Sequence, residues 1–461
     1  MDYSAANTAV WNPVVQCGIL AATILLANLL RRKVGFIRRM MMPTAVLGGF
    51  ILLILKITGL IRVDPVFMEG ITYHCIAIGF IATSLRIPSR NEEDRGNLVG
   101  LRSGAIIVGS YMIQAVVGLT ISILLGYTLI PSLFKASGIL LPMGYGQGPG
   151  QANNIGGSYE ALGFAGGRSF GLALAAAGYV CACIVGVIYL NYLVKKGKLV
   201  RRDPDEMAGS VTIDTFQDHN EIPISESVDR FSVQMALVLF VYLATFLLTK
   251  YLTMGLSAIS EGLGNSLNSL LWGFNFMIGS GLAIGLRSIF SLLRKSRIMV
   301  RQYQNNYLLS RISGFAFDLM IVAGIVSIEL EDLSGLWIPF ILMAVSGAVV
   351  TLVHLKYVCS KVYPGYYYEG LISMYGMMTG TISSGVLLLR EIDPNFETPA
   401  ANNLVIGSSF AILLGAPLLV LVSLAPKSDL MTLVTLGLII VYYAVLLCIV
   451  NLRSAGKKKN S

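Results

Sequence analysis

Charged side chains are scarce in this 461-residue chain, since Asp, Glu, Lys and Arg together make up only 13% of it. An ordinary soluble protein carries about 25% charged residues, so about half of the usual solvating charge is missing. This deficit excludes a cytosolic enzyme, a disordered chain and a small secreted disulfide scaffold. Hydrophobic residues reach 55% and the mean hydropathy is +0.72. The chain is therefore predicted to be a polytopic membrane protein.

Residues that bind metals or carry out catalysis are also few, with three histidines and six cysteines in the whole chain. Cys181 and Cys183 are two positions apart without a His or Cys partner nearby, so a zinc site is not expected. His74 and His354 stand alone in apolar runs, which leaves no catalytic triad, carboxylate pair or metal cluster for a membrane enzyme. We therefore expect neither an enzyme nor a bound cofactor.

Long apolar runs define the expected architecture, because a helix needs about 20 mostly apolar residues to cross a bilayer. Two stretches, 135–165 and 362–390, are apolar but too rich in Gly, Pro and small polar residues to be ordinary spans. The sequence predicts an all-α protein with about eleven transmembrane helices. These predicted spans cover residues 12–30, 41–61, 70–87, 104–130, 169–194, 231–254, 266–291, 312–330, 336–355, 402–424 and 429–451.

Basic residues predict the orientation. The first apolar run ends in Arg31-Arg32-Lys33 and has no positive charge before it, the reverse of a cleaved signal peptide. With the N-terminus outside, alternating spans place 28 of the 34 Lys and Arg residues on the cytoplasmic side, as the positive-inside rule requires. The C-terminus is then cytoplasmic. The same rule explains the net charge of +9 without a nucleic-acid partner.

The position of the two Gly-rich stretches predicts an inverted repeat. A polar stretch, 195–230, separates five spans from six and is expected to be a cytoplasmic linker. Each Gly-rich stretch lies between the fourth and fifth spans of its half, and five is odd, so the second unit must be inverted. The expected units are 1–194 with a re-entrant hairpin over 135–165, 231–424 with a re-entrant hairpin over 362–390, and 425–461 as an extra span and basic tail. Matching interrupted segments in inverted repeats point to the binding site of a secondary transporter.

The first hairpin carries neutral polar side chains among glycines in an otherwise apolar chain. Glycine allows tight turns and close approach to a ligand, and the free N–H groups at the start of the returning helix suit a carboxylate. No Gly-Lys-Ser/Thr sequence follows, so a nucleotide loop is not expected. The predicted substrate-binding residues here are Gly146, Gln147, Gly148, Gln151, Asn153 and Asn154, and Ser158 is a predicted ion ligand.

Small hydroxyl residues gather in the second hairpin, where the chain is also expected to break. Thr379 and Thr381 are predicted to bind substrate, and Ser383 and Ser384 to bind a coupling Na⁺ through their oxygens. The alternative is that such hydroxyls bond back to their own helix. Asp318 is flanked by apolar residues and is predicted to hold Na⁺ or a substrate ammonium. The alternative is a structural role, either as a partner of Arg287 or at a helix terminus.

With these motifs the chain resembles the bacterial sodium/glutamate symporter family. The family's Gly-Gly-His-Gly-Thr motif corresponds to Tyr145-Gly146-Gln147-Gly148-Pro149, followed by Leu162-Gly163-Phe164 for its Tyr-Gly-Phe-like step. Its Thr-Pro-Thr-Ala-like break corresponds to Thr379-Gly380-Thr381-Ile382, and Thr398-Pro399-Ala400 echoes a later Pro-Ala step. Gln147 replaces the family's His, Pro149 its Thr and Gly380 its Pro. These three differences from the family motifs bear on which substrate is bound, more than on the fold or the sodium coupling.

The resemblance implies a sodium-coupled symporter of L-glutamate or a related anionic solute in a bacterial inner membrane, without a cofactor. It also implies an elevator-type mechanism and a homodimer. Three rivals remain at this point: a symporter of a different anion, a proton-coupled transporter and an ion channel. A channel filter would also need irregular backbone at the membrane midplane, but it needs no inverted repeat within one chain.

Overall fold

A computed structural model describes residues 2–35, 37, 42–87, 97–199, 229–259, 268, 271–273, 275–299, 301–393 and 398–452. Within these ranges the protein is helical and contains no β-strand. Nine of the described helices are long and apolar enough to cross a membrane, as expected for a polytopic membrane protein. They are α1 (Thr8–Lys33), α4 (Pro65–Leu85), α6 (Asn97–Tyr127), α9 (Gly167–Lys195), α10 (Arg230–Ile259), α12 (Asn275–Lys295), α13 (Asn306–Val326), α14 (Trp337–Val362) and α19 (Asp429–Val450).

Two predicted spans take a different form. The span expected over 41–61 corresponds to α3 (Thr44–Ile57), which has only 14 residues. The span expected over 402–424 is broken into α17 (Ala400–Leu414) and α18 (Ala416–Leu424), which bend by 50° at Gly415. Pro417 lies in the first turn of α18, where its missing N–H does not interrupt that helix but cannot continue the bonds of α17.

Both Gly-rich stretches form helical arms joined by a break, and re-entry of each hairpin from one face of the membrane stays a prediction. The first hairpin consists of the 3₁₀ turn η1 (Lys135–Ile139), α7 (Leu140–Tyr145) and α8 (Pro149–Glu160). The second hairpin consists of α15 (Tyr367–Thr379) and α16 (Ile382–Arg390). The linker expected over 195–230 and the basic tail after 452 lie almost wholly outside the described residues.

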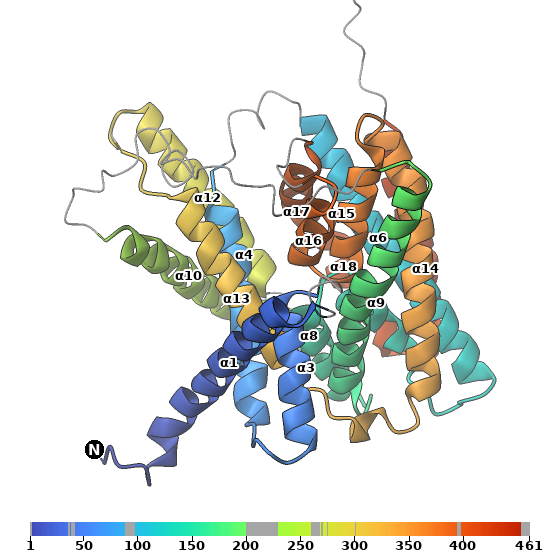
Figure 1. Ribbon diagram of the computed structural model, residues 1–461, viewed down its shortest axis with the longest axis horizontal. Coiled ribbons are helices and arrows are strands. Elements are labelled where there is room, and N and C mark those ends of the chain that lie inside the picture. Colours follow the sequence, from blue (N-terminus) through green and yellow to red (C-terminus); the bar gives the residue numbers. More distant parts are fainter. Residues whose placement is uncertain are drawn as a thin grey trace, which may run out of the picture.

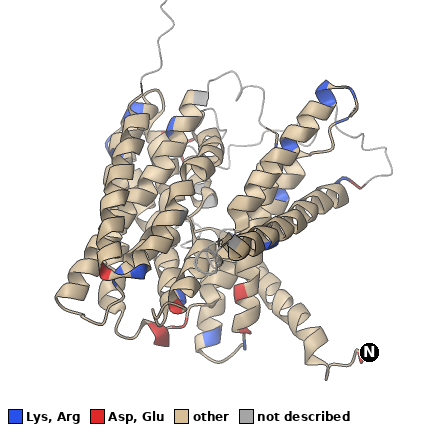
Figure 2. Cartoon of the chain, turned by 180° about the vertical axis from the view of Figure 1, so that it is seen from behind, with Lys and Arg blue, Asp and Glu red and all other residues tan. Residues whose placement is uncertain are grey.

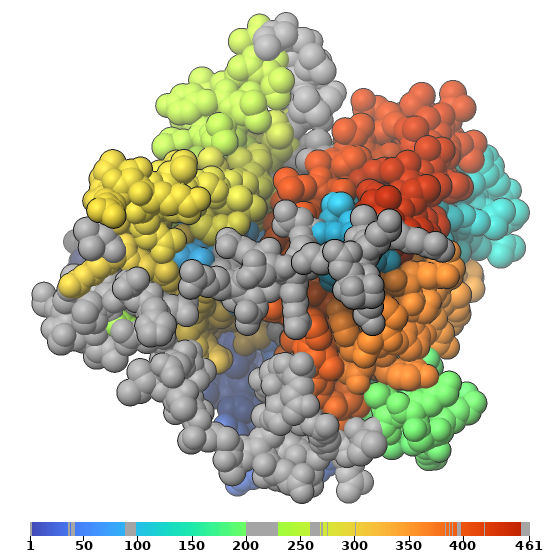
Figure 3. Space-filling view, turned by 90° about the horizontal axis from the view of Figure 1, so that it is seen from above, coloured from blue at the N-terminus to red at the C-terminus, as the bar shows by residue number. Residues whose placement is uncertain are grey.

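The helices form two bodies (Figure 1). The first body contains α1, α3, α4, α10, α12 and α13, and the second contains α6, α9, α14, α17, α18, α19 and both hairpins. Seen from above, α10 and α12 (yellow-green and yellow) lie opposite the orange and red segments from α14 onward (Figure 3). The bodies meet where α8 packs against α4 and α13, and where α9 packs against α13. The first hairpin therefore lies at the boundary between them.

Within the first body, the helices from the two halves of the chain make equivalent packing contacts. Helix α3 packs on α13 while α12 packs on α4, and α1 packs on α3 while α10 packs on α12. Helices α4 and α13 pack on each other. Exchanging the helices before residue 195 with those after residue 229 reproduces this set of contacts. The inverted repeat itself stays a prediction, and this packing agrees with it.

Most charged residues lie toward the ends of the helices (Figure 2). Three ion pairs join helix ends: Lys56 with Glu329, Lys135 with Asp429, and Arg168 with Glu69. Fully buried residues are mostly apolar or small, and the largest core cluster extends through both bodies. Burying charge in hydrocarbon is costly, so the few polar groups in the middle of the protein require an explanation.

Candidate functional site

The breaks of the two hairpins lie side by side in the middle of the protein. The first break consists of Gly146, Gln147 and Gly148, and the second of Gly380 and Thr381. Gly148 has a φ of +88°, and a Cβ placed on it would lie 3.9 Å from Thr381 Cγ2. A left-handed backbone favours glycine, so this position requires the residue that the sequence supplies.

Helices α6 and α9 hold the end of the second hairpin's first arm. A Cβ placed on Gly178 of α9 would lie 2.3 Å from the carbonyl oxygen of Thr379, so the two backbones touch. Gln114 of α6 donates hydrogen bonds from Nε2 to the Met378 carbonyl (2.9 Å) and to Thr351 Oγ1 (2.8 Å). These contacts position the broken backbone, whose own helical hydrogen bonds end here.

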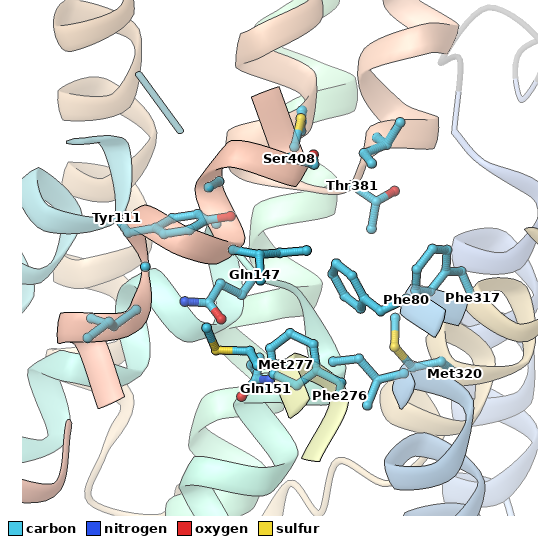
Figure 4. Close-up of a pocket in the computed structure, with 18 of the residues that line it drawn as sticks. Phe80, Tyr111, Gln147, Gln151, Phe276, Met277, Phe317, Met320, Thr381 and Ser408 are labelled. Atoms are coloured by element: carbon cyan, nitrogen blue, oxygen red, sulfur yellow. The ribbon is translucent and has the colours of Figure 1, made fainter. Parts of the chain in front are cut away.

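A cavity of about 110 Å³ opens beside the two breaks (Figure 4), with room for several water-sized groups. In Figure 4, Phe80, Phe317 and Met320 lie on one side, Tyr111 lies on the other, and Gln147 lies between them. The polar part of its lining comes from the hairpins, α17 and α6: Gly146, Gln147, Gln151, Gly380, Thr381, Ser408 and Tyr111. The apolar wall contributed by the first body consists of Ile76, Phe80, Phe276, Met277, Phe317 and Met320.

Several buried polar atoms in or near the two hairpins have no hydrogen-bond partner among the described residues, and Gln151 and Thr381 among them also line the cavity. They are Gln151 Oε1 and Nε2, Asn153 Oδ1, Asn154 Oδ1, Tyr179 Oη, Thr381 Oγ1 and Ser384 Oγ. Each buried polar group left unsatisfied costs about 1–3 kcal/mol, and native proteins contain few of them. A cluster of such atoms from both hairpins is therefore a candidate ligand site, which a bound solute, ion or water would complete.

Four of the predicted substrate residues line the cavity, namely Gly146, Gln147, Gln151 and Thr381. Asn153 and Asn154 are buried further along α8, and Asn154 Nδ2 donates to the Gly273 carbonyl at 2.9 Å. That bond ties α8 to the segment before α12 and leaves the Asn154 oxygen facing no donor.

The predicted hydroxyl ligands fall into two groups. Thr379 Oγ1 donates to the Tyr375 carbonyl (2.8 Å) and Ser158 Oγ to the Asn154 carbonyl (2.9 Å), so both protons bond back to their own helix. Ser384 Oγ is buried and unpaired next to the second break. Ser383 belongs to α16, but its side chain lies outside the described residues.

Asp318 lies on α13 and faces the second body. Its side chain makes no hydrogen bond or ion pair with a described residue, and the group in electrostatic range is the hydroxyl of Tyr179 on α9. Arg287 donates instead to the carbonyls of Ser84 (3.3 Å) and Arg86 (2.9 Å) at the end of α4. The structural alternative for Asp318, a pair with Arg287, is therefore wrong.

Sequence reasoning missed Tyr179, Gln114 and the aromatic wall. Gln114 is a lone amide in the long apolar run of α6, a signal that could have marked it, since polar side chains at membrane depth are usually functional. Tyr179 follows the close-packed Gly178. The wall residues Phe80, Phe276 and Met320 had no such signal, because apolar side chains facing a cavity or facing lipid look alike in sequence.

A comparison with protein-family models adds independent support. The model described as sodium/glutamate symporter matches residues 13–380, so the match contains the whole first hairpin and ends at the break of the second. A comparison with curated proteins finds no match for this sequence. The resemblance drawn from the hairpin motifs is confirmed.

Proposed function

The chain belongs to the sodium/glutamate symporter family, and from that premise we propose that it couples Na⁺ entry to the uptake of a carboxylate solute, with L-glutamate as the family's reference substrate. Membership of this family implies a sodium-coupled transporter in a membrane. The observation that supports the proposal most is the cluster of unpaired buried polar atoms from both hairpins beside one cavity. The proposed membrane is the bacterial inner membrane, with the N-terminus outside and the C-terminus in the cytoplasm.

The substrate carboxylate is held at the start of α8. Helix α8 begins at Pro149 directly after the break, and the unbonded N–H groups of its first turn carry partial positive charge. Gln147 and Gln151 add amide donors from the same break and turn, and Thr381 adds a hydroxyl from the second hairpin. These groups can bind a carboxylate without a basic side chain.

The coupling Na⁺ is held by oxygen atoms near the same breaks. Na⁺ prefers backbone carbonyls and neutral oxygens at broken helices, and Thr381, Ser384 and Asn153 offer buried oxygens without partners. Asp318 offers one carboxylate from the opposite body. One negative charge facing several neutral oxygens suits a monovalent cation.

Transport proceeds by movement of the second body against the first. The cavity is lined by both bodies, so relative movement of the bodies changes which side of the membrane it faces. The first body then serves as the scaffold and as the dimer contact, and the inverted repeat relates the outward-facing and inward-facing arrangements. This is an elevator mechanism with both hairpins on the moving part.

The class is tested by uptake of labelled L-glutamate and other carboxylates into proteoliposomes with and without an inward Na⁺ gradient. Uptake that depends on the Na⁺ gradient supports the proposal. Uptake driven by a proton gradient alone would overturn the sodium coupling in favour of a proton-coupled transporter. Ion conductance without saturable counterflow would overturn it in favour of a channel.

The site is tested in the same assay. Gln147→Ala and Asn153→Ala should each raise the half-saturation for substrate or for Na⁺ severalfold, while Asn451→Ala, an exposed position after α19, should leave both unchanged. Normal kinetics in both hairpin variants would overturn the site assignment. Na⁺ titrations of Asp318→Asn should show weaker Na⁺ dependence at unchanged protein stability.

A further inference from the structure

The residues that line the cavity beside the hairpins limit the class of substrate that the cavity can bind. Resting on the proposed function, we infer that this chain carries a carboxylate with one negative charge and an apolar side chain, such as an aliphatic, thioether or aromatic amino acid. A dicarboxylate such as glutamate has a carboxylate at both ends, and the residues that line the cavity supply no positive charge for the second one.

The polar pole is well defined. Gln147 and Gln151 approach from the start of α8, and Thr381 approaches from the second break. Both amide atoms of Gln151 and the hydroxyl of Thr381 lack partners in the described part of the chain. Amide N–H groups and the first turn of α8 suit a carboxylate, and the amide and hydroxyl oxygens suit an ammonium group. One carboxylate, with or without an α-amino group, satisfies this pole.

The opposite side of the cavity is an apolar wall. Phe80, Phe317 and Met320 lie there (Figure 4), and Phe80 lies 4.9 Å from Phe276 and 5.5 Å from Phe317 between ring centroids. Aromatic rings and thioethers offer a polarizable surface to an apolar group. This wall suits a hydrocarbon or thioether chain.

The apolar lining is not confined to the face of the first body. Met377, Ile382, Ile412 and Leu418 belong to the second body and also line the cavity. Apolar side chains therefore line the cavity from both bodies.

No positive charge is available for a second carboxylate. None of the residues lining the cavity is Lys, Arg or His. The sequence from 260 to 274, part of which lies outside the described residues before α12, contains no basic residue either. An ionised carboxylate buried without a partner costs several kcal/mol. A second carboxylate placed against this wall would therefore be rejected.

The test is a substrate panel in proteoliposomes carrying an inward Na⁺ gradient. Labelled L-leucine, L-methionine and L-phenylalanine are compared with L-glutamate and L-aspartate, and 4-methyl-2-oxopentanoate shows whether the α-amino group is needed. We expect Na⁺-dependent uptake of at least one apolar substrate, with a ratio of maximal rate to half-saturation about tenfold or more above that of glutamate.

The outcomes separate this inference from the proposed function. Na⁺-driven uptake of glutamate at an efficiency equal to or above that of every apolar substrate overturns the inference and leaves the proposed function standing. An absence of Na⁺-driven uptake for the whole panel, with folded protein, overturns the proposed function and the inference with it.

A pair of variants tests whether the apolar wall of the cavity contacts the substrate. Phe80 is partly buried and lines the cavity, whereas Phe240 is exposed on α10. Phe80→Ala should raise the half-saturation for the best apolar substrate severalfold without changing the half-saturation for Na⁺, and Phe240→Ala should change neither. Equal behaviour of the two variants would contradict the placement of the apolar side chain against this wall.

Discussion

Arg168, at the start of α9, is ion-paired with Glu69 of α4, so one charge contact ties the second body to the first. The backbone N–H of Arg168 also donates to Glu160 Oε1 at 2.9 Å, and the next residue, Ser169, donates from Oγ to Asp332 Oδ2 at 2.8 Å. All these contacts lie at one end of the helices. A movement of the second body along the first has to break the pair between Arg168 and Glu69.

Removing that pair should speed the movement. Glu69→Gln removes a partly exposed ion pair, which is worth up to about 1 kcal/mol. If separation of the two bodies at this pair limits turnover, the maximal uptake rate should rise by no more than about fivefold. Initial uptake rates at saturating substrate and Na⁺ measure this.

The matched control is Glu329→Gln, which breaks the pair with Lys56 inside the first body. This variant loses the same kind of charge contact without a tie between the bodies, so its maximal rate should stay at the wild-type value. Identical rates in both variants would show that the Arg168 pair does not restrain the movement.

Gly148→Ala should abolish or strongly reduce transport. The glycine has a φ of +88° and a ψ of −175°, a conformation that costs an L-residue about 1–3 kcal/mol, and the nearest atoms to an added Cβ are 3.7 and 3.9 Å away. The loss therefore arises from a shifted backbone at the break and not from a clash.

Gly163→Ala controls for the strain itself. Gly163 has a φ of +99° and no atom within 4 Å of an added Cβ. Both variants should lower the thermal midpoint by similar amounts in detergent, and only Gly148→Ala should lose uptake. Equal loss of uptake would mean that strain anywhere in the loops, and not the break, impairs the protein.

Gly178→Ala should be more damaging, because its Cβ would lie 2.3 Å from the carbonyl oxygen of Thr379. Backbone cannot move aside as a flexible side chain does, so the end of α15 must shift away from α9. Gly281→Ala in α12 has open space around its Cβ and should be neutral or slightly stabilising. Thermal midpoints and uptake rates of the two variants should diverge. Wild-type uptake in Gly178→Ala would mean that the second break is not held by this contact.

The sequence predicted the helical class and eleven spans, nine of which correspond to long apolar helices in the described residues, and it placed the two Gly-rich breaks, because these features depend on local composition. A long apolar run in a membrane has few structures open to it other than a helix. The glycines at Gly146 and Gly148 disfavour a continuous helix. The bend at Gly415 was missed, because a span broken by Gly-Ala-Pro has the same mean hydropathy as a continuous one.

The candidate site was predicted in part. Gln147, Gln151 and Thr381 stood out because neutral polar groups are rare in so apolar a chain. Sequence could not separate Thr379 from Thr381, since only the packing decides which hydroxyl finds its own helix's carbonyl. The wall around Phe80 depends on the approach of α4, α12 and α13, which are far apart along the chain.

Tyr179 offers a test of whether the site is built for a ligand. Its hydroxyl is buried and unpaired near Gly148 and within electrostatic range of Asp318. Removing an unsatisfied polar atom relieves a desolvation cost, so Tyr179→Phe should keep or raise the thermal midpoint of the substrate-free protein. If the hydroxyl serves the bound state, the same variant should raise the half-saturation for Na⁺ or substrate severalfold.

Tyr145→Phe is the matched control, because the Tyr145 hydroxyl is equally buried but donates to the Ala344 carbonyl at 2.6 Å. Its loss removes a buried hydrogen bond and should cost about 0.5–1.5 kcal/mol of stability, with little change in half-saturation among the molecules that remain folded. The two variants should thus show opposite patterns, one losing affinity and the other losing stability. A fall in midpoint for Tyr179→Phe as large as that for Tyr145→Phe would mean that the Tyr179 hydroxyl is bonded without a ligand, and its place in the site would have to be given up.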